Sequence, residues 1–95
     1  MPYVLIRHKV ADYARWKRVV RGAAPFRKAG GEQSFQVFRS SKAPNDLTVV
    51  CRWANAGRAR KFVASAELRK RMREAGVISK PEIHFFKNAE DLSVA

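Results

Sequence analysis

Residues 47–54, LTVVCRWA, are the most hydrophobic short run of the chain, and their length and β-branched content predict a buried strand. The preceding stretch SSKAPND (40–46) has the Pro, Asn and Asp residues typical of a turn. Before it, EQSFQVFR (32–39) alternates apolar and polar residues, as a second strand does. So short a connection predicts an antiparallel pair. Near the N-terminus, YVLIRHKV (3–10) is a further β-branched, apolar run and is predicted to be the first strand.

A helix is expected between the first strand and this pair. Asp12 stands at the position of an N-cap residue. Pro25 predicts a kink, or a short second helical segment through Lys28. Gly30 and Gly31 would then end the helix as a glycine C-cap does. The apolar stripe of the helix recurs at spacings of three and four: Tyr13, Trp16, Val20, Ala23 and Ala24.

The C-terminal half adds two helical segments and a last strand. Asn55 and Ser65 are suitable N-cap residues, and Gly76 is a suitable terminator. We therefore expect helices at 56–65 and 66–75, followed by a strand at 83–87, IHFFK.

The order of elements predicts the fold class. Strand, helix, strand, strand, helical pair and strand make a βαββαβ chain, the ferredoxin-like α+β arrangement. Right-handed crossovers place the helices on one face of a four-stranded antiparallel sheet. With 95 residues, the chain is expected to be a single domain over 1–95.

The two faces of this sheet differ in chemistry. Because side chains alternate along a strand, one set is wholly apolar and suits the face beneath the helices: Val4, Ile6, Phe35, Val37, Val49, Cys51, Ile83 and Phe85. The other set mixes large apolar groups with polar and charged ones: Leu5, Arg7, Gln36, Phe38, Val50, Arg52, His84 and Phe86. Such an apolar patch is unusual on a monomer, so we expect a homodimer that covers this face. A partly polar cavity between the two sheets would suit a small molecule.

Composition excludes several classes of protein. Hydrophobic residues make up 46% of the chain, which is a globular proportion. No apolar run approaches the roughly 18 residues of a membrane span. The N-terminus lacks the basic region and cleavage site of a signal peptide. Cys51 is the one cysteine, so no internal disulfide is possible. A cytoplasmic protein is the simplest expectation.

Several segments together resemble a known superfamily. They are VLIRHKV in the first strand, DYARWK at the first helix, TVVCRWA in the third strand, and SAELRKRMREAGV leading to PEIHFF. These segments resemble the dimeric α/β-barrel superfamily, and most closely its antibiotic-biosynthesis-monooxygenase-like branch. Its members include cofactor-independent monooxygenases acting on polyaromatic substrates, haem-degrading enzymes, isomerases and ligand-binding proteins. The resemblance therefore implies the fold and a homodimer. We expect a small-molecule-binding protein or a monooxygenase-like enzyme that needs no cofactor.

One position departs from the family pattern. Many monooxygenase-like members carry a histidine on the helix that follows the third-strand tryptophan, and here the corresponding place holds Phe62. The missing imidazole weakens the inference of a monooxygenase activity and that of a haem-degrading activity. Trp53 matches the family tryptophan, although its parity places it with the helix-facing set, where it can simply fill the core.

His8 and His84 are the two histidines, and histidine is the usual acid or base near neutral pH. His84 falls on the mixed face and is the candidate catalytic residue. A barrel-lining histidine with no catalytic duty is the alternative. His8 has the opposite parity to Arg7 and is a weaker candidate for ligand binding.

Arg7 and Arg52 share the mixed parity, and arginine forks suit carboxylates and phosphates. We therefore expect an anionic, aromatic ligand to contact residues of this face: Arg7, Gln36, Phe38, Arg52 and Phe86. The alternative is that these arginines pair with Glu82, with Glu32 or with the partner chain. No ligand-spacing pattern supports a metal site, and no glycine-rich loop supports a nucleotide site.

The net charge of +12 suggests a second hypothesis of a different class. The helical regions carry most of the Lys and Arg, ELRKRMRE (67–74) above all. The protein would then be a basic interaction module that binds nucleic acid or an acidic partner through its helices. No stacking platform or recognition motif accompanies this charge, so nucleic acid is not the expected partner and a solvated basic face is the ordinary outcome.

Overall fold

The computed structural model describes residues 2–94 of the chain. Along this part, strands and helices alternate in the order βααββααβ: β1 (Pro2–Lys9), α1 (Tyr13–Gly22), α2 (Ala24–Gly30), β2 (Glu32–Arg39), β3 (Asp46–Trp53), α3 (Ala56–Val63), α4 (Ala66–Glu74) and β4 (Glu82–Lys87). The ferredoxin-like α+β class is confirmed. Element bounds differ from the predicted ones by a residue or two at the ends, where helices fray and strand pairing stops.

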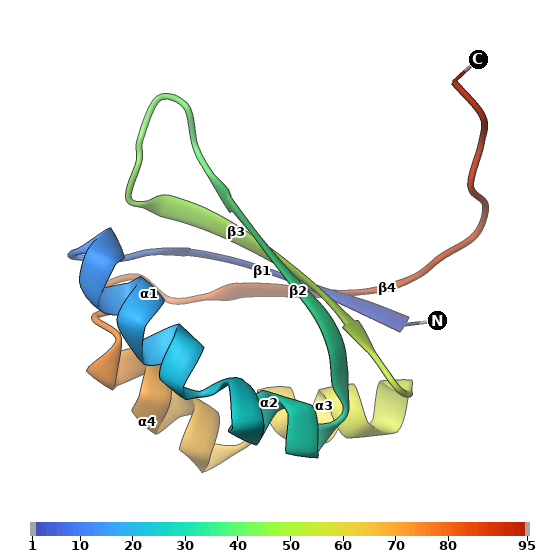
Figure 1. Cartoon of the computed structure of the whole chain (residues 1–95), viewed down its shortest axis with the longest axis horizontal. Helices are drawn as coiled ribbons and strands as arrows, with labels where there is room; N and C mark the ends of the chain where they lie inside the picture. The colour runs from blue at the N-terminus through green and yellow to red at the C-terminus, as the bar shows by residue number, and fades with distance from the viewer. Residues whose placement is uncertain (1, 95) are drawn as a thin grey trace.

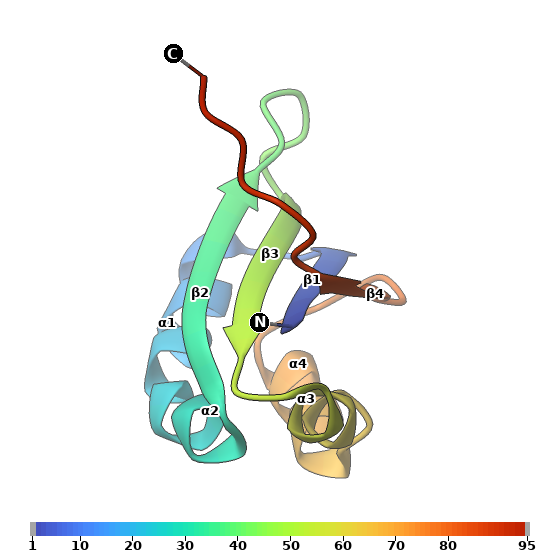
Figure 2. The ribbon, with the colours of Figure 1, turned by 90° about the vertical axis from the view of Figure 1, so that its right-hand side faces the viewer.

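The strands form a four-stranded antiparallel sheet with the order β2-β3-β1-β4 within the described residues. All of the helices lie on one side of it, and the other side is open (Figures 1 and 2). We call this second side the open face. The order follows from the connections, because a hairpin joins β2 to β3, while helical crossovers join β1 to β2 and β3 to β4.

The predicted N-caps are confirmed in the geometry of the helix starts. Asp12 Oδ1 accepts from the backbone N–H of Ala14 at 3.0 Å, at the start of α1. Asn55 Oδ1 accepts from the N–H of Arg58 at 2.8 Å, at the start of α3. Ser65 caps α4 in the same way, through the N–H of Leu68 at 3.1 Å. Each bond satisfies a donor that the helix itself leaves free.

The kink expected at Pro25 is a break between two helices. Ala23 is both the C-cap of α1 and the N-cap of α2, and Pro25 lies in the first turn of α2, where its missing N–H is not needed. Gly31 ends α2 with φ 113°, a left-handed conformation that favours glycine. The chain therefore turns directly from α2 into β2.

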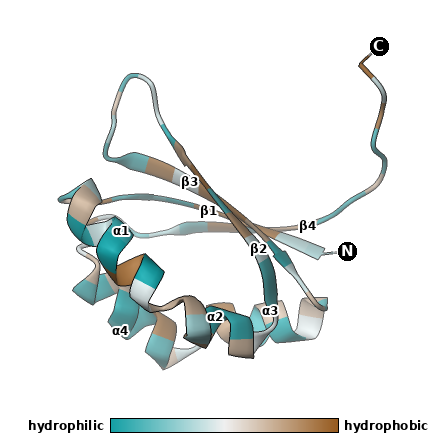
Figure 3. Ribbon diagram, in the orientation of Figure 1, coloured by the Kyte–Doolittle hydropathy of each residue, from teal (hydrophilic) through white to brown (hydrophobic). Residues whose placement is uncertain are grey.

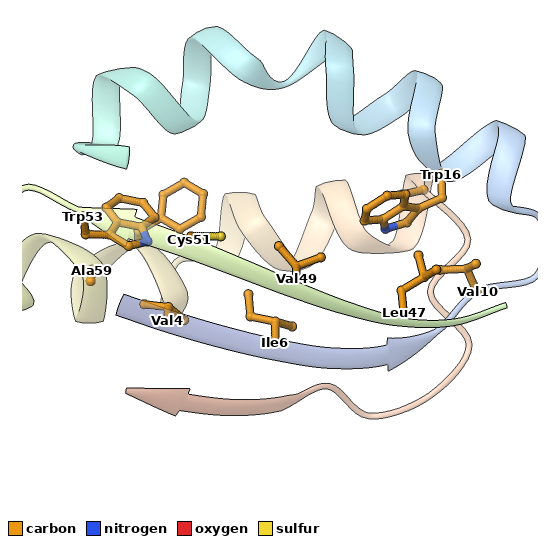
Figure 4. Close-up of a cluster of buried hydrophobic side chains, with 11 residues drawn as sticks. Val4, Ile6, Val10, Trp16, Leu47, Val49, Cys51, Trp53 and Ala59 are labelled. Atoms are coloured by element: carbon orange, nitrogen blue, oxygen red, sulfur yellow. The ribbon is translucent and has the colours of Figure 1, made fainter. Parts of the chain in front are cut away.

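The core lies between the sheet and the helices. Figure 4 shows its buried side chains, with Trp16, Leu47 and Val10 at one end and Trp53, Cys51 and Ala59 at the other. The predicted helix-facing parity is confirmed for Val4, Ile6 and Val49, which are buried. Phe85 is an exception: it is 38% exposed, and the Arg60 guanidinium lies 4.6 Å above its ring. It belongs to β4, the edge strand beyond the main helix layer.

Charge is distributed unevenly between the two layers. Thirteen of the 20 Lys and Arg residues lie in α1 to α4, against the acidic residues Glu67 and Glu74 in those helices. Figure 3 accordingly colours much of α4 as hydrophilic. No helix within residues 2–94 is long and apolar enough to cross a membrane.

Candidate functional site

A cavity of about 70 Å³ lies inside the chain, between the helix-facing side of the sheet and the helices. We call it the interior cavity. Its walls are mostly apolar and come from the three strands β1 to β3 and from all four helices of the described chain. The polar or titratable side chains in the wall are few: His8, Arg27, Glu32, Cys51, Trp53 and Arg71. They are the groups that give this space chemical character.

His8 is the titratable group at one end of the interior cavity. It lies opposite Leu47 in the β1–β3 pair, is buried, and has its ring centroid 5.8 Å from that of Trp16. Neither of its ring nitrogens has a hydrogen-bond partner among the described residues. Burial lowers the pKa of the imidazole, and the charge of Asp46 opposes this only in part. His8 is therefore neutral near pH 7 and can accept a proton or a hydrogen bond.

Trp53 marks the other end of the cavity. Its ring packs against Phe62, with ring centroids 4.7 Å apart, and its indole N–H is buried with no acceptor among the described residues. Phe62, at the place where the family pattern has histidine, is part of this apolar wall and also contacts Phe26. The indole N–H is thus a second unpartnered polar group of the wall.

Arg27, Glu32 and Cys51 form a buried polar cluster that the sequence did not predict. Arg27 Nε donates to Glu32 Oε1 at 2.9 Å, and both side chains are largely buried. Burial raises the pKa of the Glu32 carboxyl, against the effects of Arg27 and of the Cys51 thiol, which donates to it. Burial and then the Glu32 carboxylate raise the pKa of the Cys51 thiol, so it stays protonated.

A register shift explains why sequence alternation does not reveal this cluster. Simple alternation from Phe35 and Val37 puts Gln33, not Glu32, on the helix-facing side. The structure has an irregularity between Glu32 and Ser34, and Glu32 lies opposite Trp53. One extra residue in a strand reverses which side chains face inward. A single charged residue next to two glycines was the only available signal.

The remaining predicted site residues lie on the open face, in three cross-strand rows. Gln36 and His84 belong to the row of Val50 and Leu5, Arg52 and Phe86 to the row of Tyr3, and Phe38 and Arg7 to the row of Thr48. The structure therefore separates the predicted set into two groups. His8 and Trp53 face the interior cavity, and the others face away from it.

Arg7 and Arg52 are farther apart than one shared anion would need. Arg7 lies opposite Thr48, four residues along β3 from Arg52, which is roughly 13 Å at a strand's rise per residue. Arg7 also lies 3.9 Å from the carboxylate of Asp46. Among the described residues, the carboxylate paired with Arg7 is thus that of Asp46, which the sequence analysis did not name, and not that of Glu82 or Glu32.

Arg52 borders a second space on the outside of the molecule. We call it the outer groove; it lies where α2 meets β2 and β3, and its charged or polar residues are Arg27, Lys28, Glu32, Gln33, Ser34 and Arg52. Arg52 Nε is buried there with no partner among the described residues. Within residues 2–94, no three His, Cys, Asp or Glu side chains are grouped as a metal site would require.

Solved structures similar to this one are numerous, and they share its whole architecture. A candidate antibiotic biosynthesis monooxygenase from Bordetella bronchiseptica superposes with a TM-score of 0.78 at 19% identity, covering 94% of this chain and 97% of its own. SnoaB, a cofactor-independent oxygenase from Streptomyces nogalater, superposes at 0.76 and 17% identity, over 96% and 95%. A conserved protein from Methanosarcina mazei Go1 follows at 0.72 and 13%, over 93% and 92%.

No protein-family model and no curated protein matches the sequence. At these identities, the superpositions establish the fold, but a shared fold does not establish a shared activity. Over nearly its whole length, the chain shares its fold with candidate antibiotic biosynthesis monooxygenases and with SnoaB.

Proposed function

We propose that the protein binds a small, largely apolar molecule in the interior cavity and acts on it as a cofactor-independent monooxygenase. The observation that carries this proposal is His8, a neutral imidazole in the cavity wall whose two nitrogens have no partner among the described residues. A buried polar group without a partner costs roughly 1–3 kcal/mol, and a ligand that hydrogen-bonds to it recovers that cost. The shared fold with SnoaB supports the oxygenase activity.

The proposed reaction requires a base and a site that excludes water and fits the substrate. A carbon acid with an activated CH₂ group loses a proton to the neutral imidazole of His8, and the resulting carbanion is electron-rich enough to reduce O₂ directly. The CH₂ group becomes a carbonyl, one oxygen atom stays in the product, and the other leaves as water with the two hydrogens. The Trp53 N–H is a donor that can orient an oxygen at the far end of the ligand.

Anthrone, an aromatic carbon acid whose oxidation gives anthraquinone, is a direct probe of this proposal. We expect it to quench the fluorescence of Trp16 and Trp53 in a saturable manner, because both rings line the cavity. We also expect O₂ uptake and water formation with EDTA present and no cofactor added. His8→Phe should bind anthrone but lose most of the turnover, whereas His84→Phe should keep it. Unsaturable quenching with background O₂ uptake would refute the proposal.

We further propose that two copies pair through their open faces. Phe38 and Phe86 are 53% and 52% exposed there, beside the half-buried Leu5 and Val50. Covering each large apolar side chain contributes roughly 1.5–3 kcal/mol. His84, Gln36, Arg7 and Arg52 would then border the space between the sheets, where the predicted anionic ligand would contact them. The dimeric α/β-barrel superfamily is named for this kind of pairing.

A second candidate function rests on the charge of the helices, which carry almost the whole net charge of +12. The large hydrophobic side chains that are exposed lie outside α1 to α4: Phe38, Ile78, Phe85, Phe86, Leu92 and Val94. A basic surface without apolar anchors suits a polyanion bound through its charge alone. Binding of a mixed-sequence RNA at about 0.15 M salt that weakens steeply with added salt would support this candidate. Its absence would exclude it.

A further inference from the structure

The interior cavity is small and only partly enclosed. Its volume of about 70 Å³ is about half of the 150 Å³ or so that admits a benzene molecule. An aromatic ligand therefore fits only if one of the surrounding elements moves.

Helix α2 is the shortest element of the cavity wall. It has seven residues, none of them fully buried, and its N-cap makes no side-chain hydrogen bond. Gly22 precedes it in open space, where a Cβ would meet no atom within 4 Å, and Gly31 follows it with a positive φ. These glycines allow the backbone to turn at both ends of α2, as hinge residues do.

Apolar packing against α3 and a few polar contacts hold α2 in place. Arg27 on α2 donates to Glu32 at the start of β2, at 2.9 Å, and also to the carbonyl of Val20 in α1. Arg58 Nη2 on α3 donates to the carbonyl of Ala29 at 2.8 Å. The Arg27–Glu32 pair is the best shielded of these contacts, with side chains 13% and 8% exposed. A shielded, charge-assisted hydrogen bond is stronger than an exposed one.

The same pair separates the interior cavity from the outer groove. Arg27, Glu32 and Phe35 border both spaces, and the Arg27 guanidinium lies 4.3 Å above the Phe35 ring. Breaking the pair would therefore join the two spaces. On the groove side, the cations are Lys28 and Arg52, the latter with a buried and unpartnered Nε among the described residues.

We infer that α2 is the door of the interior cavity, that the Arg27–Glu32 pair latches it, and that Lys28 and Arg52 at its mouth favour the entry of anionic molecules. The identity of the molecule that enters rests on the proposed function. The role of α2 as the door is inferred from the geometry alone.

Cys51 is a built-in reporter for this door. It is the one cysteine of the chain, it is buried, and it lines the interior cavity beside Glu32. A methanethiosulfonate reagent reacts with its thiolate to give a mixed disulfide and releases methanesulfinate. The rate of this reaction measures how often the reagent reaches the cavity. In wild type, we expect a rate that barely changes with low urea, because a local opening exposes little surface.

Arg27→Met removes the latch and keeps an unbranched apolar stem of similar reach over Phe35. We expect Cys51 to react about tenfold faster or more, because tenfold is the least that losing either of the two charge-assisted hydrogen bonds of Arg27 would give. The Arg27 charge lowers the pKa of the Cys51 thiol, so its loss alone would slow the reaction. Faster labelling that still barely changes with low urea therefore reports local opening and not a change in the acidity of the thiol. Arg58→Met, which frees the carbonyl of Ala29, should accelerate labelling to a smaller extent.

Arg69→Met is the matched control, because Arg69 also bonds a backbone carbonyl, that of Ala64, but far from α2. It should leave the rate unchanged. Equal rates for Arg27→Met and Arg69→Met would overturn the latch. A wild-type rate that follows global unfolding, with its full dependence on urea, would overturn the door.

Reagent charge tests the mouth of the door. The anionic sulfonatoethyl reagent should react faster than the cationic trimethylammonioethyl reagent, and Lys28→Gln should reduce that ratio more than Lys70→Gln on α4 does. If the two lysine substitutions reduce the ratio equally, the preference for the anionic reagent comes from the net charge of the whole molecule. That result would overturn the selective role of the mouth. These readouts need no ligand, so they can succeed where anthrone binding fails, and the reverse.

Discussion

At the scale of single residues, His8 links the site to the stability of the fold. Its pKa is lowered in the folded chain from an unfolded value of 6.5. Between the two values, the unfolded chain binds more protons, so stability rises with pH in that window and is lost as pH falls below 6.5. A buried imidazole without a partner has to be charged at a cost.

We predict that the free energy of unfolding of wild type falls between about pH 7.5 and about pH 5.5, and that His8→Phe reduces this loss. Phenylalanine keeps a ring against Trp16 but cannot be protonated. Urea unfolding at several pH values measures the effect. The raised pKa of Glu32 acts with the opposite sign, but it is common to both proteins. Parallel pH profiles for wild type and His8→Phe would contradict the assignment.

The side of the sheet that a strand side chain faces could be predicted where alternation alone decides it. The inward-facing Val4, Ile6 and Val49 follow from parity, and they are buried. Glu32 did not follow, because the irregularity between Glu32 and Ser34 reverses the parity of the first residue of β2. The cavity itself depends on how seven elements pack together, and no local pattern in the sequence encodes the gap that they leave.

At the scale of elements, the junction of α3 and α4 depends on one side chain. Ser65 Oγ accepts from the N–H of Leu68 and also donates to the carbonyl of Phe62, at 2.7 Å. It thus provides a hydrogen-bond partner for a carbonyl at the end of α3 and for an N–H at the start of α4. The N-cap was predictable from sequence because its pattern is local, whereas the second bond depends on the turn between the helices.

We predict that Ser65→Ala lowers the free energy of unfolding by about 1 kcal/mol, the usual cost of losing an N-cap. Thermal or urea unfolding measures the change. Ser41→Ala is the matched control, because Ser41 is exposed in the turn between β2 and β3. An equal effect of the two substitutions would show that the N-cap hydrogen bond does not contribute to the free energy of unfolding.

At the scale of the whole molecule, the proposed dimer depends on the open face. We predict that the wild-type protein sediments as a dimer and that Phe38→Asp sediments as a monomer, because the substitution removes a large apolar side chain from the interface and puts there a charge that must give up its water. Ile78→Asp is the control, since Ile78 is an exposed apolar residue outside the strands. Sedimentation velocity distinguishes the species. A wild-type monomer at roughly 100 μM, well above a micromolar Kd, would contradict the pairing of open faces.

The concentration of positive charge on the helices has a consequence for such a dimer. Pairing the open faces turns the two helix layers outward on opposite sides, so the assembly presents a basic surface in two directions. It is then bivalent toward any long polyanion and can bridge two strands or two negatively charged particles, which a single copy can only coat. Turbidity of a polyphosphate or heparin solution should therefore rise with wild type and stay low with Phe38→Asp, when equal amounts of the two proteins are bound to the polyanion.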